Sequence, residues 1–395
     1  MADLALAGRT VLFLVTEDWY FWSHRLPLAR AAQEAGARVV VATRVDAHGA
    51  RLAAEGFEVV ALPFDRSGLS PRRDLRTLRA IVRAYRAVRP DLVHHVALKP
   101  VVYGSLAAAW TRVPAVVNAI AGMGFVFAST GRKARLLRGL TKAALALAAR
   151  GRATHMIVQN DDDRQLLVSE LRVPAARIAV IRGSGVDLQA FPATPEPPGR
   201  PLVAVCVARM LWDKGIGDLV EAARLLRQQG IDLRVRLVGG TDANPASIPE
   251  ATLQAWAAEG VVDVVGRSDD IAGEYARAHI AVLPSYREGL PKSLLEAGAC
   301  GRAMVATDVP GCRDVCRPGV TGLLVPPRDP AALAAALTRL ATDPALRQRL
   351  GIQARRLIET EFTDRHVAAA TLDLYLRLLA SPLAEPAPAR QSPAA

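Results

Sequence analysis

The sequence predicts an α/β protein with two doubly wound, Rossmann-like domains, and three observations support this fold class. The chain has 395 residues, about twice the length of an ordinary domain. Short β-branched runs alternate with longer helical patterns, as they do in parallel sheets covered by helices on both faces. A proline-rich break, FPATPEPPGRP (Phe191–Pro201), divides this alternation into two series.

The first series of strand candidates lies before the break. It begins with RTVLFLV (Arg9–Val15), continues with a helical pattern over SHRLPLARAAQEAG (Ser23–Gly36), and returns to an apolar run in ARVVVAT (Ala37–Thr43). A strand, a helix and a second strand in this order predict a βαβ unit of a parallel sheet. Later strand candidates of this series are DLVHHVA (91–97), VPAVVNAI (113–120), THMIVQN (154–160) and IAVIRGSGVD (178–187).

The second series follows the break, and its strands are nearly continuous apolar runs. We therefore expect a first domain over residues 1–190, a linker over 191–200 and a second domain over 201–361. Ligands of such sheets bind beyond the carboxyl ends of the strands, so residues that follow each strand are site candidates. The strand candidates are LVAVCVAR (202–209), DLRVRLVGG (232–240), VDVVGR (262–267), HIAVLPS (279–285), AMVATDV (303–309) and TGLLVPP (321–327).

Composition is that of a globular chain. Hydrophobic residues make up 51% of the sequence and charged residues 22%, so we expect disorder only in the Pro/Ala-rich tail, residues 383–395. No apolar run reaches the roughly 18 to 20 residues of a membrane-spanning helix, and the N-terminus lacks the basic start of a signal peptide. We expect a cytoplasmic chain that does not span a membrane. Cys312 and Cys316 have no nearby His or Cys pair to complete a zinc site, and the four cysteines are expected to be ordinary thiols.

A formal net charge of +12 predicts an anionic partner. Arginines recur at helical spacing in Arg72–Asp91, and Gly131–Arg152 reads as an apolar helix with basic ends. Both helices could contact the anionic lipids of a membrane surface. The alternative is that these arginines form ordinary solvated faces while Leu75, Ile81 and their neighbours pack on a sheet. Nucleic acid is not expected as a partner, because the arginines lack interleaved aromatics and no nucleic-acid-binding motif is present.

Two common nucleotide-binding motifs are missing. The stretches TEDWYFWSHR (16–25) and RMLWDKGIGD (209–218), each after a first strand, do not contain G-x-G-x-x-G, and GMGFVF (122–127) is too short to be specific. The phosphate-binding G-x-x-x-x-G-K-[ST] is also absent. The D-x-D pair within NDDD (160–163) is interpreted as a helix N-cap with an acidic first turn, and not as a metal site.

Two cations follow the first strand of the second series. Arg209 and Lys214 stand five residues apart in VARMLWDKG. An arginine fork and a lysine ammonium can together neutralise one diphosphate without a metal ion. The alternative, two exposed loop cations, remains open on these residues alone.

Two carboxylates lie around the stretch EGLPKSLLEAGACG (Glu288–Gly301). Glu288 and the Gly289-Leu290 backbone follow a strand, and Pro291 suits the first turn of a helix whose N–H groups then face a ligand. Glu296 falls within that helix, where a carboxylate can accept two hydrogen bonds from a ribose. A pair of glutamates beside a helix is otherwise more often a solvated face.

Taken together, the E-x₇-E pair, the stretches EGLPKSLLEAGACGRAMVATDVPGCRDV (288–315) and GVTGLLVPPRD (319–329), and the upstream cations resemble the retaining GT-B glycosyltransferases that use nucleotide-sugars. The resemblance covers nearly the whole chain. It implies two Rossmann-like domains facing across a cleft, a C-terminal helix over residues 362–382 that returns to the first domain, and catalysis without a metal ion or a cofactor. The donor-binding residues that it implies are Arg209, Lys214, Gly266, Arg267, Ile271, Glu288, Gly289, Leu290 and Glu296.

Each of these residues has an implied role. Arg209 and Lys214 would hold the donor diphosphate, and Glu296 would hold the ribose. Glu288, with the backbone of the next two residues, would hold the transferred sugar. The stretch GRSDDI (266–271) would lie beside the base.

The first half of the chain has a narrower resemblance. TEDWYFWSHRLPLARAAQEAG (16–36), HHVALKPVVYGSLAA (94–108) and VPAVVNAIAGMGFVF (113–127) are similar to transferases that extend undecaprenyl-diphosphate-linked sugars, among which N-acetylgalactosamine transfer is the best-known activity. This similarity implies a lipid-linked acceptor and a peripheral position on the inner face of the plasma membrane. The implied acceptor-side residues are His24, Lys99 and Asn118, together with His94 near the reaction centre, where the adjacent His95 is the competing candidate.

The two resemblances thus imply a retaining, metal-independent glycosyltransferase that moves an N-acetylhexosamine, with N-acetylgalactosamine first, from a UDP-sugar to a lipid-linked acceptor. Three alternatives stand beside this prediction. A glycosidase would use two carboxylates but has no need of the cationic pair. A nucleotide-sugar epimerase of the same fold, or a non-catalytic nucleotide-sugar-binding protein, would keep the donor site and dispense with the acceptor.

Overall fold

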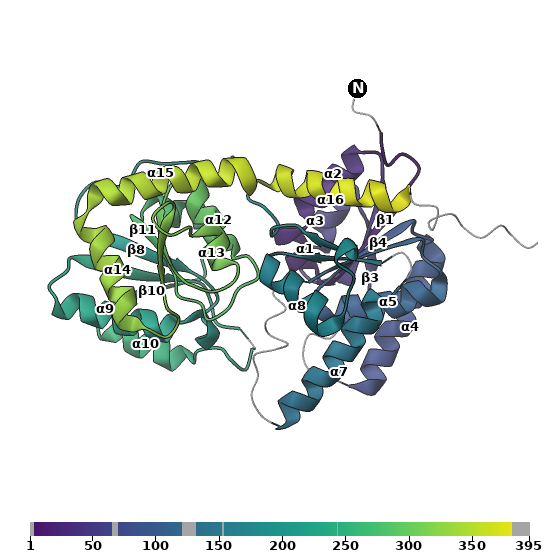
Figure 1. The fold of residues 1–395 in the computed structure, drawn as a ribbon, viewed down its shortest axis with the longest axis horizontal. Helices are drawn as coiled ribbons and strands as arrows, with labels where there is room; N and C mark the ends of the chain where they lie inside the picture. The colour runs from purple at the N-terminus through teal and green to yellow at the C-terminus, as the bar shows by residue number, and fades with distance from the viewer. Residues whose placement is uncertain (1–3, 65–69, 121–131, 152–153, 243, 381–395) are drawn as a thin grey trace, which may run out of the picture. The chain divides into compact units, whose positions relative to one another are not determined.

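The computed structural model describes residues 4–64, 70–120, 132–151, 154–242 and 244–380. They form two compact units: unit 1 is Met1–Ile181 with Val367–Ala395, and unit 2 is Arg182–His366. Each unit has its own sheet and its own helices (Figure 1). The glycine pattern at 122–127 and the tail at 383–395, both discussed above, lie outside the described residues.

Unit 1 is built on a parallel sheet whose strand order is β3-β2-β1-β4-β5-β6-β7 in the described part of the chain. From β1 the chain adds β2 and β3 on one side, and from β4 it adds β5, β6 and β7 on the other side. The β1/β4 pair is therefore the switch point of the sheet. Its strands are β1 (Thr10–Glu17), β2 (Arg38–Arg44), β3 (Glu58–Ala61), β4 (Leu92–Val96), β5 (Ala115–Ala119), β6 (Thr154–Val158) and β7 (Ile178–Val180).

Helices cover both faces of this sheet because its strands are apolar on both sides. One face packs against α1 (Asp18–His24), α2 (Leu26–Glu34), α3 (Gly49–Ala54) and the C-terminal helix α16 (Asp364–Leu379). The other face packs against α4 (Pro71–Val88), α5 (Leu98–Thr111), α7 (Arg132–Ala149) and α8 (Asp161–Leu171), with the short 3₁₀ turn η1 (Ala175–Arg177) before β7.

Unit 2 repeats this plan with a parallel sheet in the order β10-β9-β8-β11-β12-β13 among the residues described. Its switch point lies between β8 and β11. The two sheets confirm the predicted fold class of two doubly wound domains. The strands are β8 (Leu202–Val207), β9 (Leu233–Val238), β10 (Val262–Gly266), β11 (Ile280–Leu283), β12 (Ala303–Thr307) and β13 (Gly322–Val325).

The helices of unit 2 also lie on both faces of its sheet. The first face carries α9 (Ile216–Gln228), which follows the turn η2 (Trp212–Lys214), together with α10 (Glu250–Ala258) and α14 (Pro330–Thr342). The second face carries α11 (Ile271–Ala276), α12 (Lys292–Ala299) and α13 (Cys312–Val315). The long helix α15 (Pro344–Glu361) contributes its first half to one core and its second half to the other.

Local structure differs from the sequence prediction at the first helix. The helix expected over residues 23–36 is broken at Arg25, where the backbone leaves helical geometry, so that α1 ends at His24 and α2 begins at Leu26. Pro27 explains the break, because proline lacks an N–H and fits only the first turn of a helix. The short strand β3 was also missed. The N-cap interpretation of NDDD is confirmed: Asn160 Oδ1 accepts a hydrogen bond of 2.7 Å from the Asp163 N–H at the start of α8.

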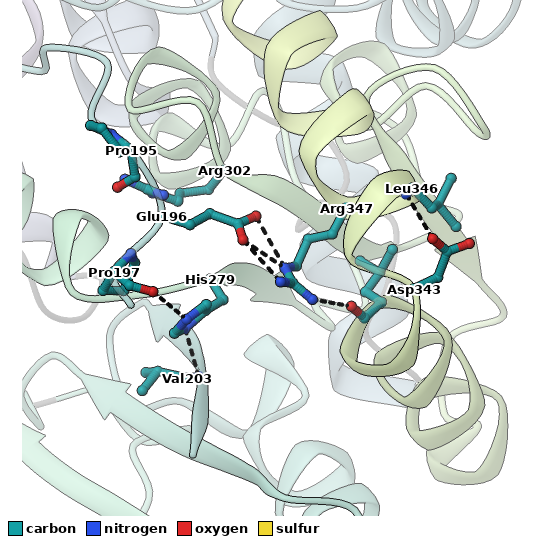
Figure 2. Close-up of polar contacts among 10 residues, drawn as sticks. Pro195, Glu196, Pro197, Val203, His279, Arg302, Asp343, Leu346 and Arg347 are labelled. Atoms are coloured by element: carbon teal, nitrogen blue, oxygen red, sulfur yellow. Dashed lines mark hydrogen bonds and ion pairs between the residues drawn. The ribbon is translucent and has the colours of Figure 1, made fainter. Parts of the chain in front are cut away.

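The proline-rich stretch at 191–200, expected as a linker, lies in unit 2. Two buried arginines bind it at the amino-terminal edge of the sheet (Figure 2). Arg302, just before β12, donates from Nη2 to the Thr194 carbonyl at 2.8 Å. Arg347 of α15 donates from Nε and Nη2 to the carboxylate of Glu196 at 3.0 and 2.9 Å.

A buried histidine, His279, also binds the proline-rich stretch at this edge of the sheet. His279 Nδ1 accepts from the Val203 N–H at 3.0 Å, so the proton is on Nε2, which donates to the Pro197 carbonyl, also at 3.0 Å. The stretch is therefore an ordered part of unit 2, attached through backbone carbonyls and one carboxylate.

Replacing Arg347 with alanine should lower the free energy of unfolding of unit 2 by about 3 kcal/mol, because it leaves Glu196 without its buried partner. It also removes the donor to the Leu340 carbonyl. Urea unfolding followed by tryptophan fluorescence measures the change. The matched control is Arg349→Ala on the same helix, where the side chain is exposed and the change should stay within about 0.5 kcal/mol. Equal effects of the two substitutions would contradict the role of the buried pair.

Candidate functional site

The switch point of the unit 2 sheet brings two of the predicted site residues together. The loops after the neighbouring strands β8 and β11 carry Lys214 and Glu288, and Lys214 Nζ lies 2.6 Å from Glu288 Oε1. Both side chains are largely buried, with exposed fractions of 18% and 12%. The Ser285 hydroxyl donates to the same carboxylate oxygen at 2.7 Å. Glu288 is thus oriented by two donors before any ligand is present.

A glycine allows the two loops to approach. Gly215 ends η2 with φ of 68°, and a Cβ placed there would lie 2.0 Å from the Pro284 carbonyl oxygen. The loops are also joined by a hydrogen bond of 2.9 Å from the Tyr286 N–H to the Asp213 carbonyl. Lys214 is therefore held against the β11 loop by its own backbone neighbours.

Two thiols lie close to this ion pair. Burial raises the pKa of Cys206 to about 12 and that of Cys312 well above its usual range, and in both cases Lys214 opposes the increase while Glu288 adds to it. Both thiols stay protonated at neutral pH and are poor nucleophiles.

Arg209 lies at the carboxyl end of β8 with a different partner. Its Nη1 donates to Asp242 Oδ2 at 2.9 Å, and the two side chains are 46% and 24% exposed. Asp242 comes from the loop after β9, the other neighbour of β8. The two predicted phosphate-binding cations are therefore each paired with a carboxylate.

The backbone just after Glu288 is closely packed against the chain that follows β12. A Cβ at Gly311 would lie 2.2 Å from the carbonyl oxygen of Gly289, so the chain after β12 touches this backbone directly. Leu290 is buried and packs on Gly183. Helix α12 begins at Lys292, and Pro291 is its N-cap residue, one position earlier than the predicted first turn.

Glu296 lies in the middle of α12 and is only 8% exposed. Burial raises the pKa of its carboxyl to about 7, and Lys292, whose Nζ is 3.6 Å away, limits the increase. Near neutral pH this carboxyl is divided between its neutral and charged forms. A ligand that donates hydrogen bonds to it would favour the charged form.

The residues expected beside the base lie at the carboxyl ends of β9 and β10. The Gly239 N–H donates to the Gly266 carbonyl at 2.8 Å, and Gly240 lies against the aliphatic stem of Arg267. Ile271 is the first residue of α11, which is capped by Asp270. All three predicted residues are thus on the same edge of the sheet as Arg209.

In unit 1 the predicted histidine His94 lies in β4 and is 1% exposed. Its Nδ1 shares a hydrogen bond with the Tyr375 hydroxyl of α16, and its ring stacks on Phe13 at 5.4 Å. Burial holds the pKa of His94 well below its usual range, and Arg25 and His95 lower it further. Its Nε2 is buried and has no hydrogen-bond partner within the described residues.

His95 faces the opposite side of the sheet, where it is fully buried. Its Nε2 contacts the Tyr85 hydroxyl at 2.9 Å, and its Nδ1 contacts Asn118 Oδ1 at 2.7 Å. Burial lowers the pKa of His95 to about 4, although the bond to Asn118 opposes the decrease. Asn118, predicted as an acceptor ligand, is itself 0% exposed and also bonds Ser105, so in this structure it orients a histidine.

The other two acceptor-side candidates are more accessible. His24 ends α1, where its ring stacks on Tyr20 at 4.3 Å between centroids. Lys99 lies in the first turn of α5, with its Nζ 3.9 Å from Asp74 Oδ1. Both follow strands of the β1/β4 switch point, but the structure joins neither of them directly to His94.

Three residues that contact the predicted site residues were not predicted from the sequence: Ser285, Asp242 and Tyr375. The first two follow the ends of strands that had been predicted, so an inspection of every polar residue at those ends could have found them. Tyr375 contacts His94 across 281 positions of the chain, and no local pattern signals such a contact.

Among the described residues, no three His, Cys, Asp or Glu side chains are placed together so that they could hold a metal ion. In the same part of the chain, no helix combines the length and the apolar character that crossing a membrane requires.

Comparison with known proteins identifies the family. The model for glycosyl transferases group 1 matches residues 201–343 and the model for glycosyl transferase 4-like proteins matches residues 10–160. A curated relative, the N,N'-diacetylbacillosaminyl-diphospho-undecaprenol alpha-1,3-N-acetylgalactosaminyltransferase of Campylobacter jejuni, is 27% identical over 90% of this chain and 95% of its own length.

Solved structures show the same fold. A sucrose-phosphate synthase from Thermosynechococcus elongatus has a TM-score of 0.78 at 22% identity, covering 94% of this chain and 99% of its own. The Anabaena protein HepE, solved in complex with UDP-glucose, has a TM-score of 0.74 at 18% identity, covering 92% and 99%. With both domains matched by glycosyltransferase models, the chain belongs to the group 1, GT4-like glycosyltransferases of GT-B fold.

Proposed function

We propose that this glycosyltransferase moves an N-acetylhexosamine, with N-acetylgalactosamine the first candidate, from a UDP-sugar to an undecaprenyl-diphosphate-linked sugar. The observation that carries the proposal is the similarity, across nearly the full length of both chains, to a transferase whose name states that donor sugar and that lipid carrier. The UDP-glucose complex of HepE supports a UDP-linked donor.

The donor diphosphate would bind at the carboxyl edge of the unit 2 sheet. Arg209 and Lys214 are the cations there, and both can donate to phosphate oxygens. The stabilisation that matters for rate is of the charge that develops on the departing diphosphate. Lys214 would keep contact with Glu288 or exchange it for phosphate, since an ammonium carries three donors.

The remaining donor contacts follow the same edge. Glu296, in α12, would accept hydrogen bonds from the ribose hydroxyls. Glu288, already oriented by Ser285, would accept from hydroxyls of the transferred sugar, with the Gly289 and Leu290 backbone beside it. Gly266, Arg267 and Ile271 would border the base.

The reaction would retain the anomeric configuration. The acceptor hydroxyl attacks the anomeric carbon on the face from which the diphosphate leaves, the carbon–oxygen bond to the diphosphate breaks, and the hydroxyl proton passes to the leaving group. No enzyme nucleophile is needed. The protonated thiols of Cys206 and Cys312 agree with a mechanism in which neither residue is alkylated by the sugar.

Unit 1 would bind the acceptor. His24 and Lys99 are the proposed contacts, because each is partly accessible at the carboxyl side of the β1/β4 switch point. His94 and Asn118 would act from inside the unit, through the positions of the strands that carry them. The burial of both side chains favours this indirect role over direct contact with the lipid-linked sugar.

A membrane surface fits the exposed side of α4. Arg72, Arg76, Arg79, Arg83 and Arg86 are all exposed and recur at helical spacing, so they form a single stripe along the helix. The neighbouring helix α5 exposes 67% of Trp110 and 42% of Leu106. We propose that these helices place the enzyme on anionic lipid at the inner face of the plasma membrane. The side chains at the basic start of the Gly131–Arg152 segment lie outside the described part of the structure.

Transfer of radiolabelled sugar from UDP-GalNAc and UDP-GlcNAc into an undecaprenyl-diphosphate-sugar, with EDTA present, tests the proposal. Labelled lipid that depends on the acceptor is the expected result. If the protein binds UDP but labels no lipid with these or other common UDP-sugars, the lipid-linked acceptor is ruled out. Reaction of the labelled UDP-sugar without acceptor would indicate an epimerase or a hydrolase that acts on the donor alone.

Arg209→Ala and Lys214→Ala should each lower kcat by about a hundredfold or more, because each removes a charge that stabilises the leaving diphosphate. Arg224→Ala on α9, whose partner is Glu259 on the protein surface, is the control and should keep full activity. Melting curves establish that all three variants are folded. Near-normal turnover of either site variant would remove the diphosphate assignment.

UDP affinity should rise with pH through about 7. The free Glu296 carboxyl has a raised pKa, so below that pH it is protonated and must lose its proton to accept ribose hydroxyls. Affinity at pH 6 should be about tenfold below the plateau above pH 8. Calorimetry in two buffers of different ionisation enthalpy measures the released proton. The Glu296→Gln variant is the control, because it keeps any pH dependence that comes from UDP itself and lacks the ionisable carboxyl. An identical pH profile in the wild type and this variant would contradict the role of Glu296.

Replacing Arg76 and Arg83 with glutamine should weaken binding to vesicles that contain phosphatidylglycerol by about thirtyfold, since each of the two basic residues near an anionic surface contributes on the order of 1 kcal/mol. Vesicle flotation measures the bound fraction. Arg349 and Arg356 on α15 are exposed, and their replacement by glutamine is the charge-matched control. Equal losses in both pairs would show that binding depends on net charge and not on α4.

A further inference from the structure

Asp242 is the one close carboxylate partner of Arg209 among the described residues, and it takes no part in the proposed transfer step. Its Oδ2 lies 2.9 Å from Arg209 Nη1. It follows β9, whose neighbour β8 leads to Arg209. The pair is therefore formed by two adjacent strand ends, at the edge where the donor diphosphate would bind.

The loop after β9 fixes the position of this carboxylate. Asp242 Oδ1 accepts from the Asn244 N–H at 2.8 Å, and the Asp242 N–H donates to the Ser247 hydroxyl at 3.3 Å. Asp242 is thus held through its side chain by Asn244 and through its backbone by Ser247. Most surface ion pairs join two long, mobile side chains and contribute little, whereas here one partner is already ordered.

The same loop is tied to the residues that follow Arg209. The Met210 carbonyl accepts from the Ile248 N–H at 2.8 Å, and the Trp212 N–H donates to the Ala246 carbonyl at 2.9 Å. A bridge between Leu211 and Ser247 lies between these bonds. Any movement of the Arg209 backbone would carry the Asp242 loop with it, so the two side chains stay within reach of each other.

We propose that Asp242 is an intramolecular competitor for Arg209, which it holds when the donor is absent and releases when the diphosphate binds. The inference rests on the proposed function, because it assumes that Arg209 binds that diphosphate. An arginine fork that pairs with a phosphate loses its carboxylate partner or shares it, and the remaining negative charge lies beside the phosphates. Asp242 therefore weakens the binding of both the UDP-sugar donor and the UDP product, and it speeds the release of UDP.

Lys214 differs from Arg209 in this respect. Its partner Glu288 has a proposed task in the complex, as an acceptor for hydroxyls of the sugar, and a second donor in Ser285. The charge of Glu288 is thus compensated after the donor binds. Asp242 has no such task in the proposed complex, and its negative charge lies beside the diphosphate.

Calorimetric titration with UDP tests the proposal, using the full-length wild type, Asp242→Asn and Asp242→Ala. Both variants should bind UDP about two- to fivefold more tightly, the range for release of an exposed ion pair. Both should also show stronger product inhibition by UDP. Asp263→Asn is the matched control: it removes the same charge from an ion pair with Arg234 on the same sheet and should leave UDP affinity unchanged.

A double-mutant cycle with Arg209→Ala shows whether Asp242 acts through the arginine. The gain from Asp242→Asn should disappear in the Arg209→Ala background. Unchanged or weaker UDP binding by Asp242→Asn, with the wild type binding normally, overturns the inference. A gain that persists without Arg209 also overturns it. If the wild type itself fails to bind UDP, the proposed function fails, which is a separate outcome.

Discussion

The ion pair between Lys214 and Glu288 is the contact on which the rest of the site depends. It exists because β8 and β11 are neighbours at the switch point of a parallel sheet, where the connections of adjacent strands leave in opposite directions. Gly215 lets the two loops touch, and Ser285 fixes the carboxylate. The thiols nearby stay neutral because burial raises the pKa of each of them. The cationic and acidic groups are thereby confined to one edge of the sheet.

Much of this arrangement could be read from the sequence, since apolar runs mark buried parallel strands and the groups that follow them share an edge. Strand β3 was not predicted because it has only four residues and both its ends are exposed, so it shows no long apolar run. The break at Arg25 depended on a proline within an otherwise helical pattern. The burial of Asn118 and His94 could not be predicted, because it depends on residues from other elements, Ser105 of α5 and Tyr375 of α16.

The paired histidines of β4 show how neighbouring residues acquire unrelated environments. Successive side chains of a strand point to opposite faces, so His94 meets α16 while His95 meets α4. Both remain neutral because burial disfavours the imidazolium. Each fixes a contact between the sheet and one helical layer, and together they link the carboxyl-terminal helix to the centre of unit 1.

The binding of Thr194–Glu196 by Arg302 and Arg347 has a practical consequence for dividing the chain into fragments. A proline-rich stretch is usually chosen for cutting a protein into domains or for limited proteolysis, because such stretches are often exposed and mobile. Here, a fragment starting at residue 201 would lack Glu196 and would leave two arginines in the interior without their partners. An autonomous second unit must begin near Arg182, and proteases should spare the prolines that the sequence makes look vulnerable.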